Sequence, residues 1–529
     1  MDTLPTEILH LILEYTVVGL SGNKNRLLVL RTTCKLFDEI LKPFALRTLQ
    51  LEYTRLDKTE RKLKPPDEDA LHRIGDLCRA LYIDMMVVRD ESEVRFLGNL
   101  FTRVPSLNDF FSSLRDSYSM NEESFTEIDY RRQLGLMFDN APNVTAVKLS
   151  LPFQLICPGQ WRSATMILGN SFEAMVQRPE GSKVLKTLVL ENLCDVSVRN
   201  LWRNPQDVKN IIGAFSNLQT LFISVRRNEP GGINTDNFCN RLWEMIGKAE
   251  NLESLCLVDL DADAGLQTMK TASRLRWSVE EWQSRCLPTP RKAPGSVLPN
   301  LTFLELRQVQ VMGCGLLHML KCFANSLQEL YLDGVHLKVL DWSSPPEDVN
   351  NTLWIGLPNA RPRPELKDRW VAVYLRQIQA KLRVCRVSNL GYERYVLGWE
   401  VHGDNSLTAY DLLDPCGLSR SLEQRFVEVA TGIVQPPAHT GVAVTYLPED
   451  ESQDSFALAD RARPEGGLAT EDWHATYYMA TQRNPTSACQ RSIDGQFPNY
   501  NQFTLNALHT FADKAYNGMC VFNRMERED

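Results

Sequence analysis

Several features are missing from this chain of 529 residues, and each absence excludes a class of protein. Its 13 cysteines are scattered, with no Cys-x-x-Cys and no paired clusters, which argues against a disulfide framework or a zinc site and for free thiols. No basic-then-apolar signal peptide opens the chain, and no apolar run approaches the ~18 residues of a membrane span. We therefore expect a cytoplasmic and/or nuclear protein that does not enter a membrane.

Strong positive charge and catalytic motifs are also missing. The net charge of −8 argues against nucleic acid or an anionic membrane as the main partner, because both require a concentrated basic surface. No Gly-x-x-x-x-Gly-Lys, His-Glu-x-x-His or Gly-x-Ser-x-Gly motif occurs. The acidic run that begins at Asp259 has Ala264 and Lys270 where a calcium loop needs Gly and Glu. The sequence therefore predicts neither an enzyme, nor a metal site, nor a cofactor.

What the chain does have is an unusual first segment of about fifty residues. An apolar stripe at helical spacing predicts a first helix, with Pro5 in its first turn, and consists of Leu4, Ile8, Leu11, Ile12 and Tyr15. Gly19 and residues 21–23 end that helix, and the apolar positions from Leu27 to Leu41 predict one or two more, followed by a strand. A unit of ~40–50 residues is marginally stable alone, so that we expect a partner.

This segment resembles the F-box, particularly the version common in fungal proteins. The resemblance rests on Leu4-Pro5-Thr6-Glu7-Ile8 with Ile12-Leu13, then Leu27-Leu28, then the run from Leu30 to Phe37. It implies docking on the Skp adaptor and, through it, on a cullin. The implied contact residues are Leu4, Pro5, Ile8, Ile12, Leu27, Leu28, Leu30, Cys34 and Phe37. The alternative is an ordinary helical hairpin packed on the rest of the chain.

Beyond this segment the most repeated pattern is Leu-x-x-Leu-x-Leu. Its alternation predicts short strands, most of which follow an amphipathic helical stripe, so that stacked helix–strand units would share one core. The pattern begins at Leu46, Cys78, Val144, Leu185, Leu218, Leu252, Leu301, Leu327 and Leu382.

These units resemble leucine-rich repeats, although their spacing is irregular. Starts at Leu185, Leu218 and Leu252 lie 33 and 34 residues apart, whereas the other gaps are irregular and reach 66 residues between Cys78 and Val144. The Asn or Cys of the repeat turn is also missing, and its place is taken by Leu193, Leu260, Val309 and Val335. We therefore expect an α/β fold: an F-box-like module (1–50), a degenerate leucine-rich-repeat-like solenoid (51–390), and a C-terminal extension (391–529) with a linker at about 435–467. The alternative is a large α/β domain whose parallel strands share this spacing.

The resemblances together predict a substrate-recognition adaptor of a Skp-cullin-F-box ubiquitin ligase. A scaffold bound to Skp alone and an enzyme with a site in the C-terminal region stay open as alternatives. The middle residue of each strand should point outward in a row that could bind a protein substrate: Lys148, Val189, Phe222, Cys256, Glu305, Tyr331 and Arg386. We expect Phe222 and Tyr331 to be exposed anchors there, unless insertions or the tail cover them, and Trp342 and Trp354 to form a contact loop.

Overall fold

The fold is that of a computed structural model. It describes residues 5–20, 24–55, 61–64, 66–85, 126–151, 161–226, 233–259, 286–287, 289–290, 298–340, 354, 371–372, 375, 384–396, 399–403, 423, 426, 430 and 488–497. The chain forms two compact units, one of Met1–Ser224 with Ala488–Asp529 and one of Val225–Ser487. This division does not follow the three predicted segments, whose boundaries stay predictions.

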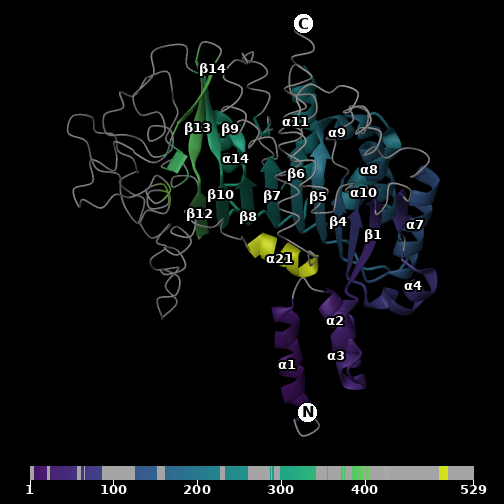
Figure 1. Ribbon diagram of the computed structural model, residues 1–529. Helices are drawn as coiled ribbons and strands as arrows, with labels where there is room; N and C mark the ends of the chain where they lie inside the picture. Colours follow the sequence, from purple (N-terminus) through teal and green to yellow (C-terminus); the bar gives the residue numbers. More distant parts are fainter. Residues whose placement is uncertain are drawn as a thin grey trace, which may run out of the picture. The chain divides into compact units, whose positions relative to one another are not determined.

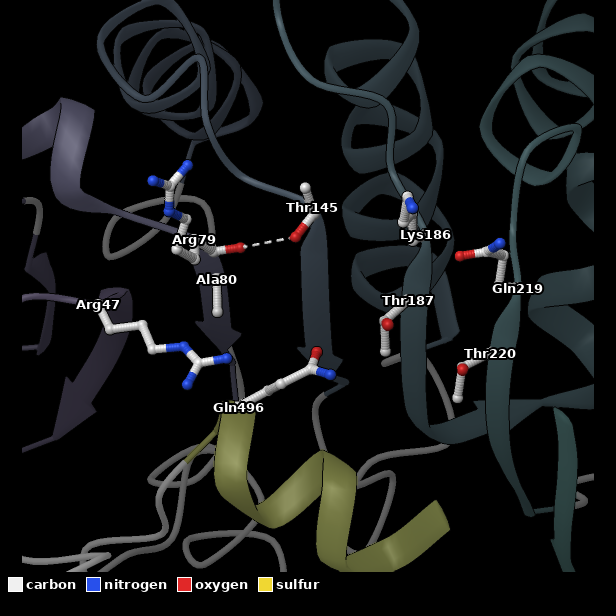
Figure 2. Close-up of a pocket in the computed structure, with 9 residues that line it drawn as sticks. All are labelled: Arg47, Arg79, Ala80, Thr145, Lys186, Thr187, Gln219, Thr220 and Gln496. Carbon is white, nitrogen blue, oxygen red and sulfur yellow. Dashed lines mark hydrogen bonds between the residues drawn. The ribbon is translucent and has the colours of Figure 1, made fainter. Parts of the chain in front are cut away.

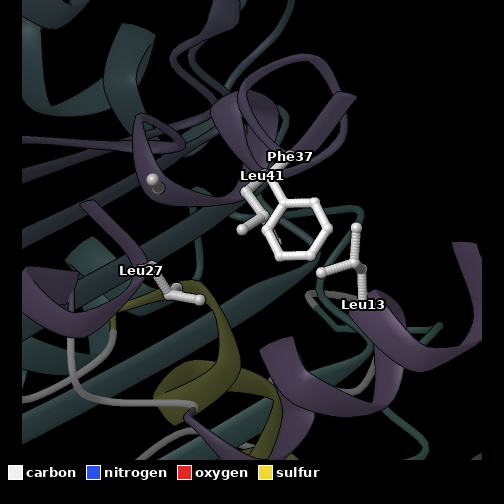
Figure 3. Close-up of a cluster of buried hydrophobic side chains, with 5 residues drawn as sticks. Leu13, Leu27, Phe37 and Leu41 are labelled. Atoms are coloured by element: carbon white, nitrogen blue, oxygen red, sulfur yellow. The ribbon is translucent and has the colours of Figure 1, made fainter. Parts of the chain in front are cut away.

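The first unit begins with three short helices and a strand, as the sequence predicted. The elements are α1 (Thr6–Gly19), α2 (Lys24–Arg31), α3 (Lys35–Ala45) and β1 (Thr48–Arg55). The helices share a small core of Leu13, Leu27, Phe37, Leu41 and Ala45 (Figure 3). An ion pair of 2.7 Å between Arg31 and Asp38 joins α2 to α3.

The rest of the first unit alternates helices and strands. In chain order these are β2 (Arg61–Lys64), α4 (Glu68–Ile74), a 3-10 turn (Gly75–Leu77), β3 (Ala80–Asp84), α7 (Glu127–Asn140), β4 (Ala146–Ser150), α8 (Trp161–Val176), β5 (Thr187–Cys194), α9 (Asp195–Leu201), α10 (Pro205–Phe215), β6 (Thr220–Arg226) and α21 (Ala488–Gln496). The strand order is β6-β5-β4-β3-β1-β2. Strands β1, β3, β4 and β5 pair in parallel, and β2 is antiparallel to β1.

Helix starts in this unit follow from local capping residues. The Thr126 side chain accepts a hydrogen bond of 3.1 Å from the Asp129 amide at the start of α7. Asn204 likewise accepts from the Gln206 amide, and Pro205 occupies the first turn of α10, where its missing N–H costs nothing. Helices α8 and α10 then pack together through Phe172 and Phe215, whose ring centroids lie 5.8 Å apart.

The second unit contains two sheets (Figure 1). Its elements are α11 (Ile233–Ile246), β7 (Ser254–Asp259), β8 (Phe303–Arg307), β9 (Gln310–Met312), α14 (Gly313–Cys322), β10 (Glu329–Asp333), β11 (His336–Leu340), β12 (Val384–Ser388), β13 (Gly391–Val396) and β14 (Trp399–Gly403). One sheet has the order β12-β10-β8-β7 and the other the order β14-β13-β11-β9. In the first sheet all the pairs are parallel. Every predicted Leu-x-x-Leu-x-Leu strand is present, which confirms the parallel α/β class.

Left-handed turns join the two sheets of the second unit. Gln308, Gly334 and Asn389 each lie two residues after the final apolar position of a motif, with φ of 52°, 65° and 51°. The next residues, Val309, Val335 and Leu390, are buried and lead into β9, β11 and β13. The place of the missing Asn or Cys is therefore occupied by a core side chain.

Candidate functional site

Helix α1 carries apolar side chains on two faces. Leu9 and Leu13 point inward and are buried, and Val17 packs partly against the core of the module. Ile8 and Ile12 lie on another face and are 43% and 45% exposed. Removal of exposed aliphatic side chains from water is favourable, so this face is suited to contact with a protein partner.

Further apolar groups of the module are exposed as well. Leu11 is 51% and Tyr15 76% exposed on α1, and Pro5 before the helix is exposed too. Val29 on α2 is 69% exposed, although sequence reasoning did not name it as a contact residue. The only sequence signal for the exposure of Val29 is helical spacing, which directs its side chain away from those of Leu27 and Leu30.

The other predicted docking residues have mixed positions. Leu27 and Phe37 are buried in the module's own core, and Leu28 and Leu30 are half-buried. Cys34 is exposed at the start of α3, and Leu4 lies outside the described residues. Leu27 and Phe37 therefore hold the helices together, while Ile8 and Ile12 are available for contact.

The predicted substrate row is aligned in the sheets but is not exposed. Register places Lys148 beside Val189 in one unit, and Cys256, Glu305, Tyr331 and Arg386 side by side in the other. The prediction that Phe222 and Tyr331 are exposed is wrong, since their relative exposures are 8% and 5%. Glu305 is buried as well.

Side-chain packing across neighbouring strands and an ion pair within β8 account for this burial in the second unit. The rings of Phe303 and Tyr331 lie 4.9 Å apart, and the Arg386 guanidinium lies 5.6 Å from the Tyr331 ring centroid. Glu305 accepts a 2.5 Å hydrogen bond from Arg307. Burial, partly offset by Arg386, raises the pKa of Tyr331 to about 12.

The same face of the first unit holds a buried polar cluster. Lys148 Nζ lies 2.8 Å from Glu191 Oε1, and Ser150 Oγ donates to Glu191 Oε2 at 2.5 Å. The Tyr82 hydroxyl donates to Asp84 at 2.9 Å. Burial, with the nearby Asp84 and Glu191 carboxylates, raises the pKa of Tyr82 well above its ordinary value. These groups satisfy one another, so the cluster is structural rather than an open reaction centre.

Trp354 is a core residue rather than an exposed contact. Its side chain is 0% exposed, its ring N–H donates to the Gly391 carbonyl at 3.0 Å, and it packs edge-on against Phe426. The expectation of an exposed contact at Trp354 is therefore wrong, because the indole finds both its apolar and its polar partners inside the fold. Trp342 lies outside the described residues.

Among the described residues, no group of His, Cys, Asp and Glu could hold a metal ion, and no helix is long and apolar enough to cross a membrane. No known protein-family model matches the chain, and no curated protein is significantly similar to it. The exposed apolar face of α1 is the strongest candidate site in the described part of the chain.

Proposed function

We propose that the chain is a substrate-recognition adaptor of a Skp-cullin-F-box ubiquitin ligase, in which α1 to α3 dock on the Skp adaptor. The observation that carries this proposal is the exposure of Ile8 and Ile12 beside a core the module builds for itself. In an ordinary hairpin packed on its own chain, these side chains would be covered.

The repeated helix–strand units support the second half of the proposal. In both units a residue before one strand offers its carbonyl to two successive amides of the next strand. The Thr145 carbonyl accepts from Lys186 and Thr187, and the Thr302 carbonyl accepts from Gln328 and Glu329. The repetition of one backbone contact favours a leucine-rich-repeat-like solenoid over a sheet whose strands share a spacing by chance. Such a solenoid would present a substrate to the ligase.

The experiment is affinity purification of the tagged full chain from cells. Recovery of the Skp adaptor together with a cullin supports the ligase adaptor, whereas recovery of Skp without a cullin would replace it with the scaffold. The matched pair of variants is Ile8→Asp, Ile12→Asp on α1 and Ile128→Asp on α7, where Ile128 is 80% exposed. We expect only the α1 variant to lose Skp; purification of the native chain without Skp would contradict the proposal.

A further inference from the structure

One edge of the first unit's sheet repeats a single residue position. The Arg47 carbonyl accepts from the Arg79 and Ala80 amides, and the Arg79 carbonyl accepts from Thr145 and Ala146. The same double contact recurs at the Thr145 carbonyl on the next strand and at the Lys186 carbonyl on the strand after that. Side chains at this position therefore follow one another along the edge, about 4.8 Å apart from strand to strand.

Three side chains of this row are cationic. Arg47, Arg79 and Lys186 line a pocket of about 270 Å³, to which Gln496 at the end of α21 also contributes (Figure 2). No carboxylate is among the described residues that line the pocket. Within the described part of the chain, none of these three side chains forms an ion pair or a side-chain hydrogen bond. The pocket therefore holds positive charge that the described residues do not neutralise.

The backbone repeat does not itself require these cations. In the second unit the equivalent positions are Glu253, Thr302 and Gln328, and the Glu253 carbonyl still accepts from Thr302 and Phe303 at 2.9 and 3.0 Å. The double backbone contact thus forms equally well when the residue at this position has an acidic side chain. In a chain of net charge −8, two arginines and a lysine around one pocket call for another explanation.

Neutral donors complete the lining. The hydroxyl groups of Thr145, Thr187 and Thr220 and the amide groups of Gln219 and Gln496 border the same space (Figure 2). Arginine binds phosphate oxygens through two parallel N–H groups, and hydroxyl groups add further hydrogen bonds to an oxyanion. Arg79 and Lys186 are separated by two strand steps, about 9.6 Å, which is wider than one phosphate group.

From this arrangement we infer that the pocket binds a free small molecule that carries a diphosphate group. Arg47 and Arg79 bind one phosphate and Lys186 the other, while the threonine hydroxyls contact the bridging side. This inference does not rest on the proposed adaptor function, because the pocket is formed by the sheet edge and α21. The competing explanation is that the cations only balance the negative end of the α21 dipole, which requires no ligand.

The test is isothermal titration of the full chain with sodium pyrophosphate at constant ionic strength. We expect saturable binding at one site per chain, and at least tenfold weaker binding by the Arg79→Gln, Lys186→Gln variant. Both side chains are exposed, so that the fold tolerates their replacement. The matched control is Lys183→Gln, Lys209→Gln, which removes two other exposed cations of the unit and should leave affinity unchanged.

Four outcomes would overturn the inference. The first is no saturable binding of pyrophosphate by the folded native chain. The second is equal affinity in the pocket and control variants, which would mean nonspecific attraction. The third is binding of a doubly phosphorylated peptide but not of pyrophosphate, which would assign the pocket to a protein ligand. A pocket variant that is less stable yet binds pyrophosphate like the native chain would favour the helix-dipole explanation.

Discussion

The Thr48 hydroxyl donates a hydrogen bond of 2.9 Å to the carbonyl of Gln496, 448 residues further along the chain. It joins the first strand of the sheet to the last described helix, α21. Cys489 and Ile493 on that helix and Phe497 directly after it recur every four residues and are buried. The C-terminal region thus completes the first unit, which a division into consecutive segments would not suggest.

We predict that Thr48→Val loosens α21. The variant removes the donor to a carbonyl at the helix end, which should lower the free energy of unfolding by ~0.5–1.5 kcal/mol. Hydrogen exchange should speed up in residues 488–496 and stay unchanged in α7, which packs against α8. Unchanged exchange in α21 would show that its apolar contacts alone hold it.

The second prediction concerns the strand interior. Leu255 and Cys256 point to opposite faces of β7 and are both 0% exposed. Leu255→Asp and Cys256→Asp should each bury an unpaired carboxylate and abolish folding, as measured by circular dichroism. A mild effect at Cys256 alone would mean that this face opens in solution, as the sequence had suggested.

The third prediction separates the two partners of the buried ion pair. Lys148→Met leaves the Glu191 carboxylate without its cation and should cost ~3–5 kcal/mol of stability. Adding Glu191→Leu should restore most of that loss, since an apolar pair of similar volume avoids the desolvation penalty. A double-mutant cycle of urea unfolding measures the coupling; purely additive losses would deny that the two charges stabilise each other.

The fourth prediction is an alkaline loss of stability through Tyr130. Burial raises the pKa of this phenol, partly offset by its hydrogen bond to Ser171. Above the ordinary value of 10.0 the unfolded chain loses this proton while the folded chain keeps it, so stability falls as pH rises. In Tyr130→Phe this component disappears, and its stability deficit relative to the native chain should shrink above pH 10. The exposed Tyr15→Phe is the control and should follow the native curve.

Sequence patterns predicted the strands but not what covers them. Alternation of Leu255 with Cys256 shows that the two side chains point apart, yet it carries no information on which face a neighbouring segment covers. Phe222 and Tyr331 were therefore assigned to the surface wrongly. Helix α21 was missed because Ala488–Gln496 contains few apolar residues, and its burial depends on strands hundreds of residues away.

The left-handed turns between the two sheets of the second unit were also missed, because no local sequence motif marks them. Gln308 and Asn389 adopt a positive φ that is uncommon for residues other than glycine, and neither stands in a Gly-rich turn motif. By contrast, helical spacing in the sequence did predict an apolar stripe on α1 that contains Ile8 and Ile12. It did not predict the second apolar face, on which Leu9 and Leu13 are buried.

The most direct test of the account is the dissociation constant between the purified chain and the purified Skp adaptor, measured by isothermal titration. We predict one-to-one binding that Ile8→Asp, Ile12→Asp weakens by roughly 100-fold or more, because the interface would then bury two carboxylates without partners. Ile128→Asp should bind like the native chain, and all three proteins should melt cooperatively. Native affinity in the α1 variant, or no binding by the native chain, would contradict the account.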